Sequence, residues 1–114
     1  MGQSLVLGGD NFDRLLSESV DEVFTELLGR NVKRAVYAIL RKHYCIASDQ
    51  IPTKLDAFAA VMGRLFEVSS ETICKLVVKR LSLKLGLDFV EKPDYVFLDY
   101  LRDARFSTAR ILRG

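Results

Sequence analysis

The sequence has no tryptophan, only two prolines and a single histidine among its 114 residues. So few prolines favour long helices over many short strands. The lone His43 gives no basis for a histidine-based metal cluster or a serine–histidine catalytic pair with an orienting partner. Its place near the end of a predicted helix is best explained by the helix dipole. Both glycine-rich phosphate-binding motifs are also missing. We therefore expect no enzyme, no metal site and no cofactor.

Long apolar runs and targeting signals are missing too. No run approaches the roughly 20 residues of a membrane helix, and the start, MGQSLVLGGD, lacks the basic head of a secretory signal. Val6 stands where a myristoylation motif needs Ser or Thr. Cys45 and Cys74 have no C-x-x-C spacing and lie in apolar neighbourhoods, so we expect two reduced, buried thiols rather than a disulfide or a reactive thiol. These features predict a cytoplasmic protein without membrane contact.

The residues that are present predict one all-α domain spanning 1–114. Apolar positions recur at helical spacing, and 49% of the chain is hydrophobic, which is enough for a single core. About five helices, in orthogonal or bundle-like packing, are expected at residues 11–28, 31–44, 53–66, 70–85 and 93–104. Gly29 and Gly86 would end two of them, and Gly63 would allow close helix approach. We expect a flexible N-terminus at 1–10, a loop at 45–52, a short extended piece at 87–91, and a basic tail at 105–114 that either continues the last helix or is mobile.

The first predicted helix carries an apolar stripe that could also serve a two-helix seam. Its 4-3-4 spacing is formed by Leu16, Val20, Val23 and Leu27. Two heptads are too few for a coiled coil but fit a dimer contact. The stripe is therefore a candidate dimer or docking face, and we expect a homodimer.

Charge is divided unevenly along the chain. Residues 1–29 hold one basic and six acidic residues, whereas residues 30–114 hold sixteen basic and nine acidic ones. Such polarity can steer a polyanion to one end, or it can dock the acidic helix on the basic body of the same chain or of a partner. Docking is slightly favoured, because an acidic first helix repels nucleic acid.

Residues 65–81, LFEVSSETICKLVVKRL, have the rhythm of a DNA-binding helix-turn-helix. In that reading the start of the second helix would face the groove through Ser70, Thr72, Lys75 and Lys79. Glu67 argues against it, since the turn normally needs Gly there. The second helix is also apolar around most of its circumference, which favours a packed pair of core helices.

Two further basic patches could bind a partner or could simply be solvated surface. The first consists of Arg30, Lys33, Arg34, Arg41 and Lys42. Tyr37 and Tyr44, interleaved with it, could stack on bases, although a solvated helix face is the commoner explanation. The basic tail could bind phosphate or an acidic helix, or could simply aid solubility.

From residue 28 to residue 89 the chain resembles a family of small archaeal domains called the nitrosopumilus output domain. The matching segments are Leu28-Gly29, AVYAILRKHYCI at 35–46, Ile51-Pro52, Leu65-Phe66, Ile73 and LGLDF at 85–89. The chain departs from the family at residues 67–70, where a glycine-containing turn is expected. The resemblance implies a place downstream of sensory domains in signalling, and no catalytic motif.

These observations predict a non-enzymatic regulatory or protein–protein interaction module, of the signalling output or adaptor kind. Its partner would be another protein or a second copy of this chain. The alternative is a helix-turn-helix-like DNA-binding regulator that uses residues 65–81.

Overall fold

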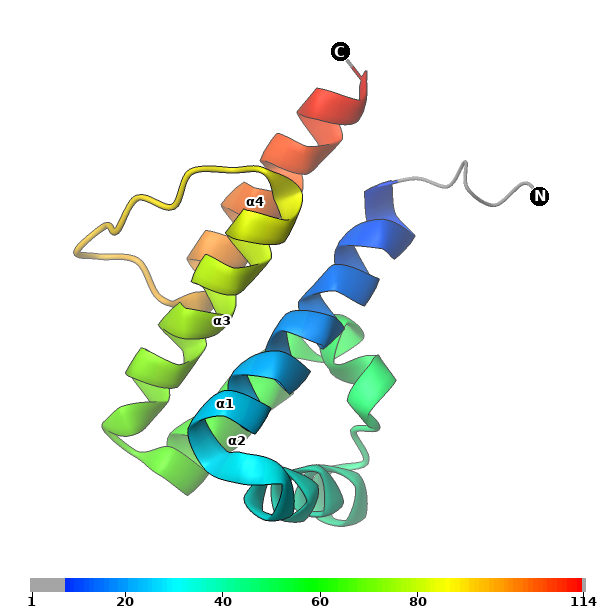
Figure 1. Ribbon diagram of the computed structural model, residues 1–114, viewed down its shortest axis with the longest axis vertical. Coiled ribbons are helices and arrows are strands. Elements are labelled where there is room, and N and C mark those ends of the chain that lie inside the picture. The colour runs from blue at the N-terminus through cyan, green and yellow to red at the C-terminus, as the bar shows by residue number, and fades with distance from the viewer. Residues whose placement is uncertain (1–7, 114) are drawn as a thin grey trace.

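A computed structural model describes the backbone of residues 8–113 and the side chains of residues 11–108. Within these residues the chain is all-α, with no strand, and folds as one globule. The helices are α1 (Gly8–Tyr44), the short 3-10 helix η2 (Ser48–Thr53), α2 (Leu55–Phe66), α3 (Ser69–Leu85) and α4 (Phe97–Arg113). The first half of α1 runs antiparallel to α3 and α4, which run in the same direction (Figure 1). The predicted fold class is confirmed.

Helix α1 is two helices joined at Gly29. Its backbone there takes φ 83° and ψ 164°, a conformation that is essentially reserved for glycine. The chain turns sharply at this point, and the second half of α1 runs across the bottom of the view, away from the lower end of the first half (Figure 1). The two helices predicted on either side of Gly29 are therefore confirmed. The start differs, because the helix already includes Gly8 to Asp10. The predicted flexible residues 1–7 lie outside the described residues.

The segment predicted as a loop before Pro52 instead contains η2. Ile51 and Pro52 are both buried, and the apolar contacts of this short helix hold it against α1. Thr53 is not the N-cap of α2. Its hydroxyl donates to the carbonyl of Gln50 at 2.8 Å, and Lys54 is the residue before the helix. The segment forms a short helix instead of an open loop because Ile51 is buried against the rest of the chain.

Helix α3 packs against α1, α2 and α4. Its buried side chains are Ile73, Cys74, Val77, Val78, Leu81 and Ser82. Gly86 ends the helix with φ 73°, and its N–H donates to the carbonyls of Leu83 and Ser82. This left-handed end was predicted. Gly63 in α2 is different: it is exposed and nothing lies within 4 Å of an added Cβ, so the prediction that it permits close helix approach is wrong.

Helix α4 begins later than its sequence predicted. Pro93 and Asp94 lie in a turn, where the Tyr95 N–H donates to the Lys92 carbonyl at 3.1 Å. The start at Phe97 is set by Asp99, whose carboxylate accepts from the Val96 N–H at 3.0 Å, as one half of a capping box does. The helical backbone continues to Arg113, so the basic tail is part of α4 as far as that residue.

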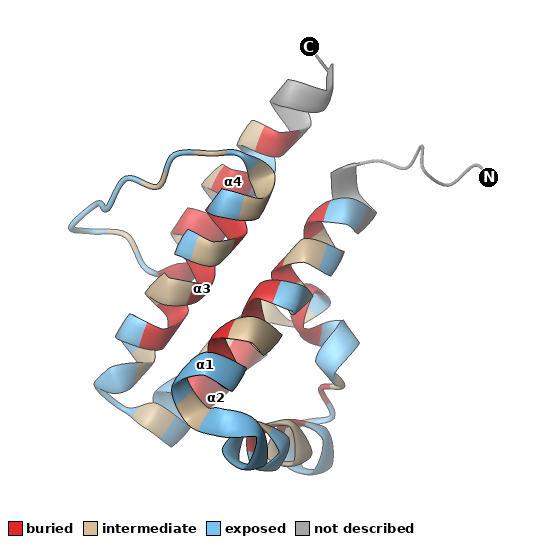
Figure 2. Cartoon of the chain, viewed as in Figure 1, coloured by how far each residue is buried: buried red, intermediate tan, exposed pale blue. Residues whose placement is uncertain are grey.

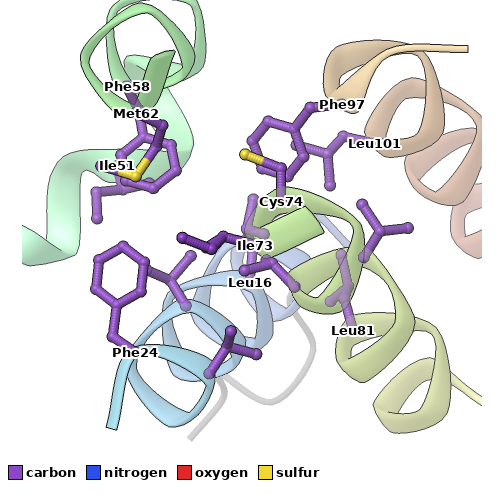
Figure 3. Packing of buried hydrophobic residues seen from close by; sticks show 14 of the residues in the cluster. Leu16, Phe24, Ile51, Phe58, Met62, Ile73, Cys74, Leu81, Phe97 and Leu101 are labelled. Carbon is purple, nitrogen blue, oxygen red and sulfur yellow. The ribbon is translucent and has the colours of Figure 1, made fainter. Parts of the chain in front are cut away.

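The core lies between the inward faces of all the helices (Figure 2). Figure 3 shows Leu16 and Phe24 from α1 meeting Phe58 from α2, Ile73 and Leu81 from α3, and Leu101 from α4. Three rings connect α1, α2 and α4, since Phe58 lies 6.4 Å from Phe24 and 6.2 Å from Phe97. Such ring pairs add to the stabilisation from burial.

Candidate functional site

The polar stripe of α3 that was predicted to contact nucleic acid is partly occupied by the chain itself. The Lys75 ammonium forms an ion pair with Glu91, and Lys79 lies over the ring of Phe89, 5.6 Å from its centroid. Both partners belong to residues 86–96, which connect α3 to α4. We call this segment the crossover loop. The carboxylate of Glu91 thus takes the place that a phosphate would need on Lys75. The same pair raises the pKa of Lys75 and lowers the pKa of Glu91.

The other two predicted contact residues lie at the start of α3 without a ligand-like partner. Thr72 is exposed, and the Ser70 hydroxyl donates to the Glu67 carbonyl at 2.7 Å. Glu67 itself has φ 49° and ψ −123°, a conformation that favours glycine in a turn. The objection that a glycine is expected there therefore has a structural basis: the turn does take a glycine-like conformation, and glutamate adopts it under strain.

A cluster of polar side chains ties the crossover loop to α4. The Tyr95 hydroxyl donates to Asp103 at 2.6 Å, and the Lys92 ammonium lies 3.6 Å from the same carboxylate. The hydrogen bond from Tyr95 holds the pKa of Asp103 below its ordinary value, and it raises the pKa of Tyr95. Tyr100 adds a reciprocal pair with the Lys92 backbone, accepting at 2.8 Å and donating at 3.1 Å. The loop is therefore held in one position against α3 and α4.

An open cavity of about 420 Å³ lies between this loop, α3 and α4. Val78, Leu87 and Phe89 form apolar parts of its lining, and Lys92 and Asp103 form charged parts. The sequence did not identify this cluster. Its only available signal is the i, i+4 spacing of Asp99 and Asp103, which does not reveal that a loop folds back on this helix. In the described residues no group of three or more His, Cys, Asp or Glu side chains could hold a metal ion.

The apolar stripe of the first helix is part of this chain's own core. Leu16, Val20 and Val23 are buried, with Leu16 at 0% exposure, whereas Leu27 is 48% exposed. Helix α1 packs against η2, α2, α3 and α4. Three of the four residues are therefore unavailable for contact with a second copy. The stripe was a candidate for contact with a second copy or for docking within the chain. Its three buried residues are docked within the chain.

The acidic side chains of the same helix are also used within the chain. Arg80 donates to Glu22 at 3.1 Å and to Glu26 at 2.6 Å, and the Lys84 ammonium lies 3.0 Å from Glu22 and 3.5 Å from Glu18. At the other end of the helix, Arg105 of α4 forms an ion pair with Asp13 at 2.8 Å. The acidic helix is docked on basic residues of α3 and α4 in the same molecule.

The second half of α1 carries bases that have no such partners. Of its five lysines and arginines, Lys33 forms an ion pair, with Asp21 at 3.1 Å. Among the described residues, no ion pair involves Arg30, Arg34, Arg41 or Lys42, and all four are exposed. We call Arg30, Arg34 and Arg41 the arginine strip. Together with Lys42, it is the part of the first predicted basic patch that forms no ion pair among the described residues.

The tyrosines of that patch are not free to stack on bases. Tyr37 is half-buried, its hydroxyl donates to Asp21 at 3.2 Å, and its ring lies 5.9 Å from Phe24. Burial, together with the charge of Asp21, raises the pKa of Tyr37. Tyr44 is also half-buried and packs against the core. A binding mode based on base stacking therefore loses its support, while one based on charge keeps it.

The cysteines differ from each other. Cys74 is buried in α3, and burial raises the pKa of its thiol to about 11, so it acts as a small apolar core residue. Cys45 is exposed, with φ 57°, which corrects the prediction that both thiols are buried. The reason is that α1 ends at Tyr44 and the chain reverses at Cys45 to bring Ile46 into the core.

In the part of the chain that the structure describes, no helix has the length and apolar character to cross a membrane. Comparison with protein-family models, with curated proteins and with solved structures gives no match. The resemblance to the archaeal output domain family therefore stays a prediction. Any functional proposal has to come from the surfaces described above.

Proposed function

We propose that this protein is a non-enzymatic regulatory binding module that holds an acidic partner on the second half of α1. The observation that carries the proposal is the contrast in charge pairing. The described acids of the first half of α1, at residues 13–26, are paired within the chain, while the arginine strip and Lys42 have no acidic partner among the described residues. From residue 27 to residue 48 the sequence contains no acidic residue at all. A helix face of this kind attracts anions and repels cations.

The test is retention of the full chain on heparin and on immobilised polyglutamate as salt is raised. The variant Arg30→Gln, Arg34→Gln, Arg41→Gln should elute at clearly lower salt than the unaltered protein on both supports, because three exposed charges of the binding face are gone.

A control variant of equal charge separates the face from the overall charge. It carries Arg14→Gln, Arg64→Gln and Arg102→Gln, three exposed arginines outside the arginine strip. The control should elute near the unaltered protein. Equal losses for the two variants, or no retention of the unaltered protein, would contradict the proposal.

A helix-turn-helix-like DNA reader at residues 65–81 is the second candidate. It is favoured by the exposure of Thr72 and Lys79 at the start and middle of α3. In this reading Glu91 competes with DNA for Lys75, so Glu91→Gln should raise DNA affinity. The pair Lys75→Glu and Lys79→Glu should abolish it. Unchanged DNA affinity in both variants would remove this candidate.

The predicted homodimer and the role in signalling output stay predictions, the latter resting on the resemblance alone. A dimer needs a surface other than the stripe of α1, since Leu16, Val20 and Val23 are buried in their own chain. Light scattering coupled to size-exclusion chromatography measures the oligomeric state directly. A dimer that persists in Leu27→Glu, where the one exposed member of the stripe is charged, would show that the stripe does not form the contact.

A further inference from the structure

The arginine strip is a linear array along one edge of the second half of α1. At 100° per residue, Arg30, Arg34 and Arg41 fall within a sector of about 40°, and the 1.5 Å rise per residue spreads them over about 16 Å. Another side of this helix is anchored in the core by Val36 and Leu40. The three guanidinium groups project from one exposed line of the helix, outside this packed side.

Contacts with the first half of α1 fix the rotation of this helix about its axis. The Lys33 ammonium bonds both Asp21, at 3.1 Å, and the Thr25 hydroxyl, at 2.9 Å, and Tyr37 reaches the same aspartate. These bonds hold the helix in one rotation about its axis. Tyr37 lies next to the arginine strip, about 20° around the helix from Arg30, and the three arginines stay exposed beside it. A preorganised charged face loses less conformational entropy on binding than a flexible tail would.

The chemistry of the strip suits phosphodiesters. Guanidinium is a planar fork of donors that matches phosphate bidentately and is weakly hydrated, which is why arginine serves nucleic-acid recognition. The sector holds no exposed large apolar side chain, because Asn31 and Ala38 are the residues that fall between the arginines and Lys42 around the helix. Protein–protein interfaces usually place aromatic or other apolar anchors at their centre, whereas Tyr37, the aromatic residue next to this strip, is half-buried and bonded to Asp21.

A second copy of the chain is a poor occupant of the strip. Among residues whose side chains are described, six acids form no ion pair: Asp49, Asp56, Glu67, Glu71, Asp88 and Asp94. They are scattered over η2, α2, the turn that follows α2, the start of α3 and the crossover loop. No run of three acids on one helix face complements the arginines. A nucleic-acid strand, in contrast, offers a continuous line of charges.

Resting on the proposed function, we infer that the arginine strip binds the phosphodiester backbone of a nucleic acid without reading its sequence. The acidic half of α1 does not prevent this, since its described acids are paired with bases of α3 and α4 or, for Asp21, with Lys33. Backbone contacts position a protein on a nucleic acid and carry no sequence information by themselves.

The experiment measures binding of the full chain to two DNA duplexes of unrelated sequence, to mixed-sequence single-stranded RNA and to polyglutamate, between about 50 and 200 mM salt. The glutamine variant of the arginine strip should bind nucleic acid at least about tenfold more weakly, with a salt slope smaller by about two to three units. The control variant at Arg14, Arg64 and Arg102 should stay within about threefold of the unaltered protein.

A third variant, Arg30→Lys, Arg34→Lys, Arg41→Lys, keeps the charge and removes the fork. It should keep most of the salt slope and lose part of the affinity. Far-UV circular dichroism should show the same helix content for all variants, because every altered side chain is exposed.

Three outcomes would overturn the inference: no nucleic-acid binding at low salt, an equal loss in the control variant, or a strong preference for one duplex sequence over others. Strip-dependent binding to polyglutamate without binding to nucleic acid would overturn the inference and leave the proposed function standing. Loss of strip dependence on every anionic probe would overturn both.

Discussion

The first half of α1 carries five acidic side chains among the described residues, and the second half carries five basic ones. All five acids form ion pairs with bases of the same chain, whereas Lys33 is the one base of the second half that does so. The difference follows from packing. The first half lies beside α3 and α4, which bring Arg80, Lys84 and Arg105 to it, while the outward side of the second half faces no other helix (Figure 1). The acidic charges of the first half therefore hold it against its own chain, whereas most basic charges of the second half stay available for a partner.

The largest effect is expected where the first half meets the core. Leu16→Ala removes a side chain with 0% exposure and should lower the free energy of unfolding by about 3 kcal/mol, from lost burial and the cavity left behind. Leu27→Ala makes the same chemical change at a residue with 48% exposure and should cost less than about 1 kcal/mol. Urea denaturation of both variants gives the comparison. Equal losses of stability would contradict the structure, in which Leu16 is buried and Leu27 is exposed.

The junction between the halves should be the next most sensitive position. Gly29→Ala places a Cβ in open space, with nothing within 4 Å, so its cost comes from the backbone at φ 83°. We expect a loss of about 2 kcal/mol in the same denaturation experiment. Gly63→Ala is the control, since it too meets nothing within 4 Å but lies inside α2, where Ala is the better helix former and should stabilise. A Gly29→Ala protein as stable as the original would contradict the kink.

A paired and an unpaired lysine test the charge contrast itself. Lys84→Gln breaks contacts with Glu18 and Glu22 and should lower the free energy of unfolding by up to about 1 kcal/mol at low salt, with less effect at high salt. Lys42→Gln, in the second half, removes a charge without an ion pair and should stay within about 0.5 kcal/mol of the unaltered protein. If the two variants are equally stable, the docking of the acidic half contributes nothing measurable.

The smallest predicted effect is a pH dependence at Glu22. The hydrogen bond from Lys84, with a further one from Arg80, holds the pKa of Glu22 below its ordinary value of 4.5. Because the folded-state pKa is lowered, the stabilisation is present above about pH 4.5 and is lost as pH falls through the folded-state pKa. Glu22→Gln should therefore be less stable than the unaltered protein at pH 6 by a few tenths of a kcal/mol.

That gap should close as the solution is acidified, because the protonated carboxyl and the amide are both neutral. The corresponding measurement is denaturation of both proteins at a series of pH values. A gap that is constant with pH would mean that the Glu22 side chain matters through packing and not through its charge.

Much of the architecture follows from local sequence. The periodic apolar positions placed all the long helices, and Gly29 and Gly86 ended two of them, because positive φ is cheap for glycine and costly for other residues. Errors arose where long-range contacts decide the outcome. Burial of Ile51 makes η2 from a segment rich in turn formers, and the carboxylate of Asp99 starts α4 later than Pro93 suggests.

The candidate surfaces divide in the same way. Sequence identified the polar stripe of α3, the basic patch of α1 and the docking of an acidic helix on a basic body as possibilities. It did not reveal that Glu91 covers Lys75, that Tyr37 bonds Asp21, or that Tyr95, Lys92 and Asp103 gather beside a cavity. These contacts join residues from 8 to 16 positions apart through a loop or a kink, whose path no local pattern specifies.

The sequence by itself determined an all-α chain, the positions of its long helices and the segregation of acids before residue 30 from bases after it. These depend on the chemistry of each residue and on spacing along one helix. Only the tertiary structure decided which charges are neutralised and which face solvent, since that depends on which helices lie side by side. The arginine strip depends on both. The spacing of its residues in the sequence aligns the three arginines on one helix, and the packing of the helices leaves their side chains exposed and unpaired with any described acid.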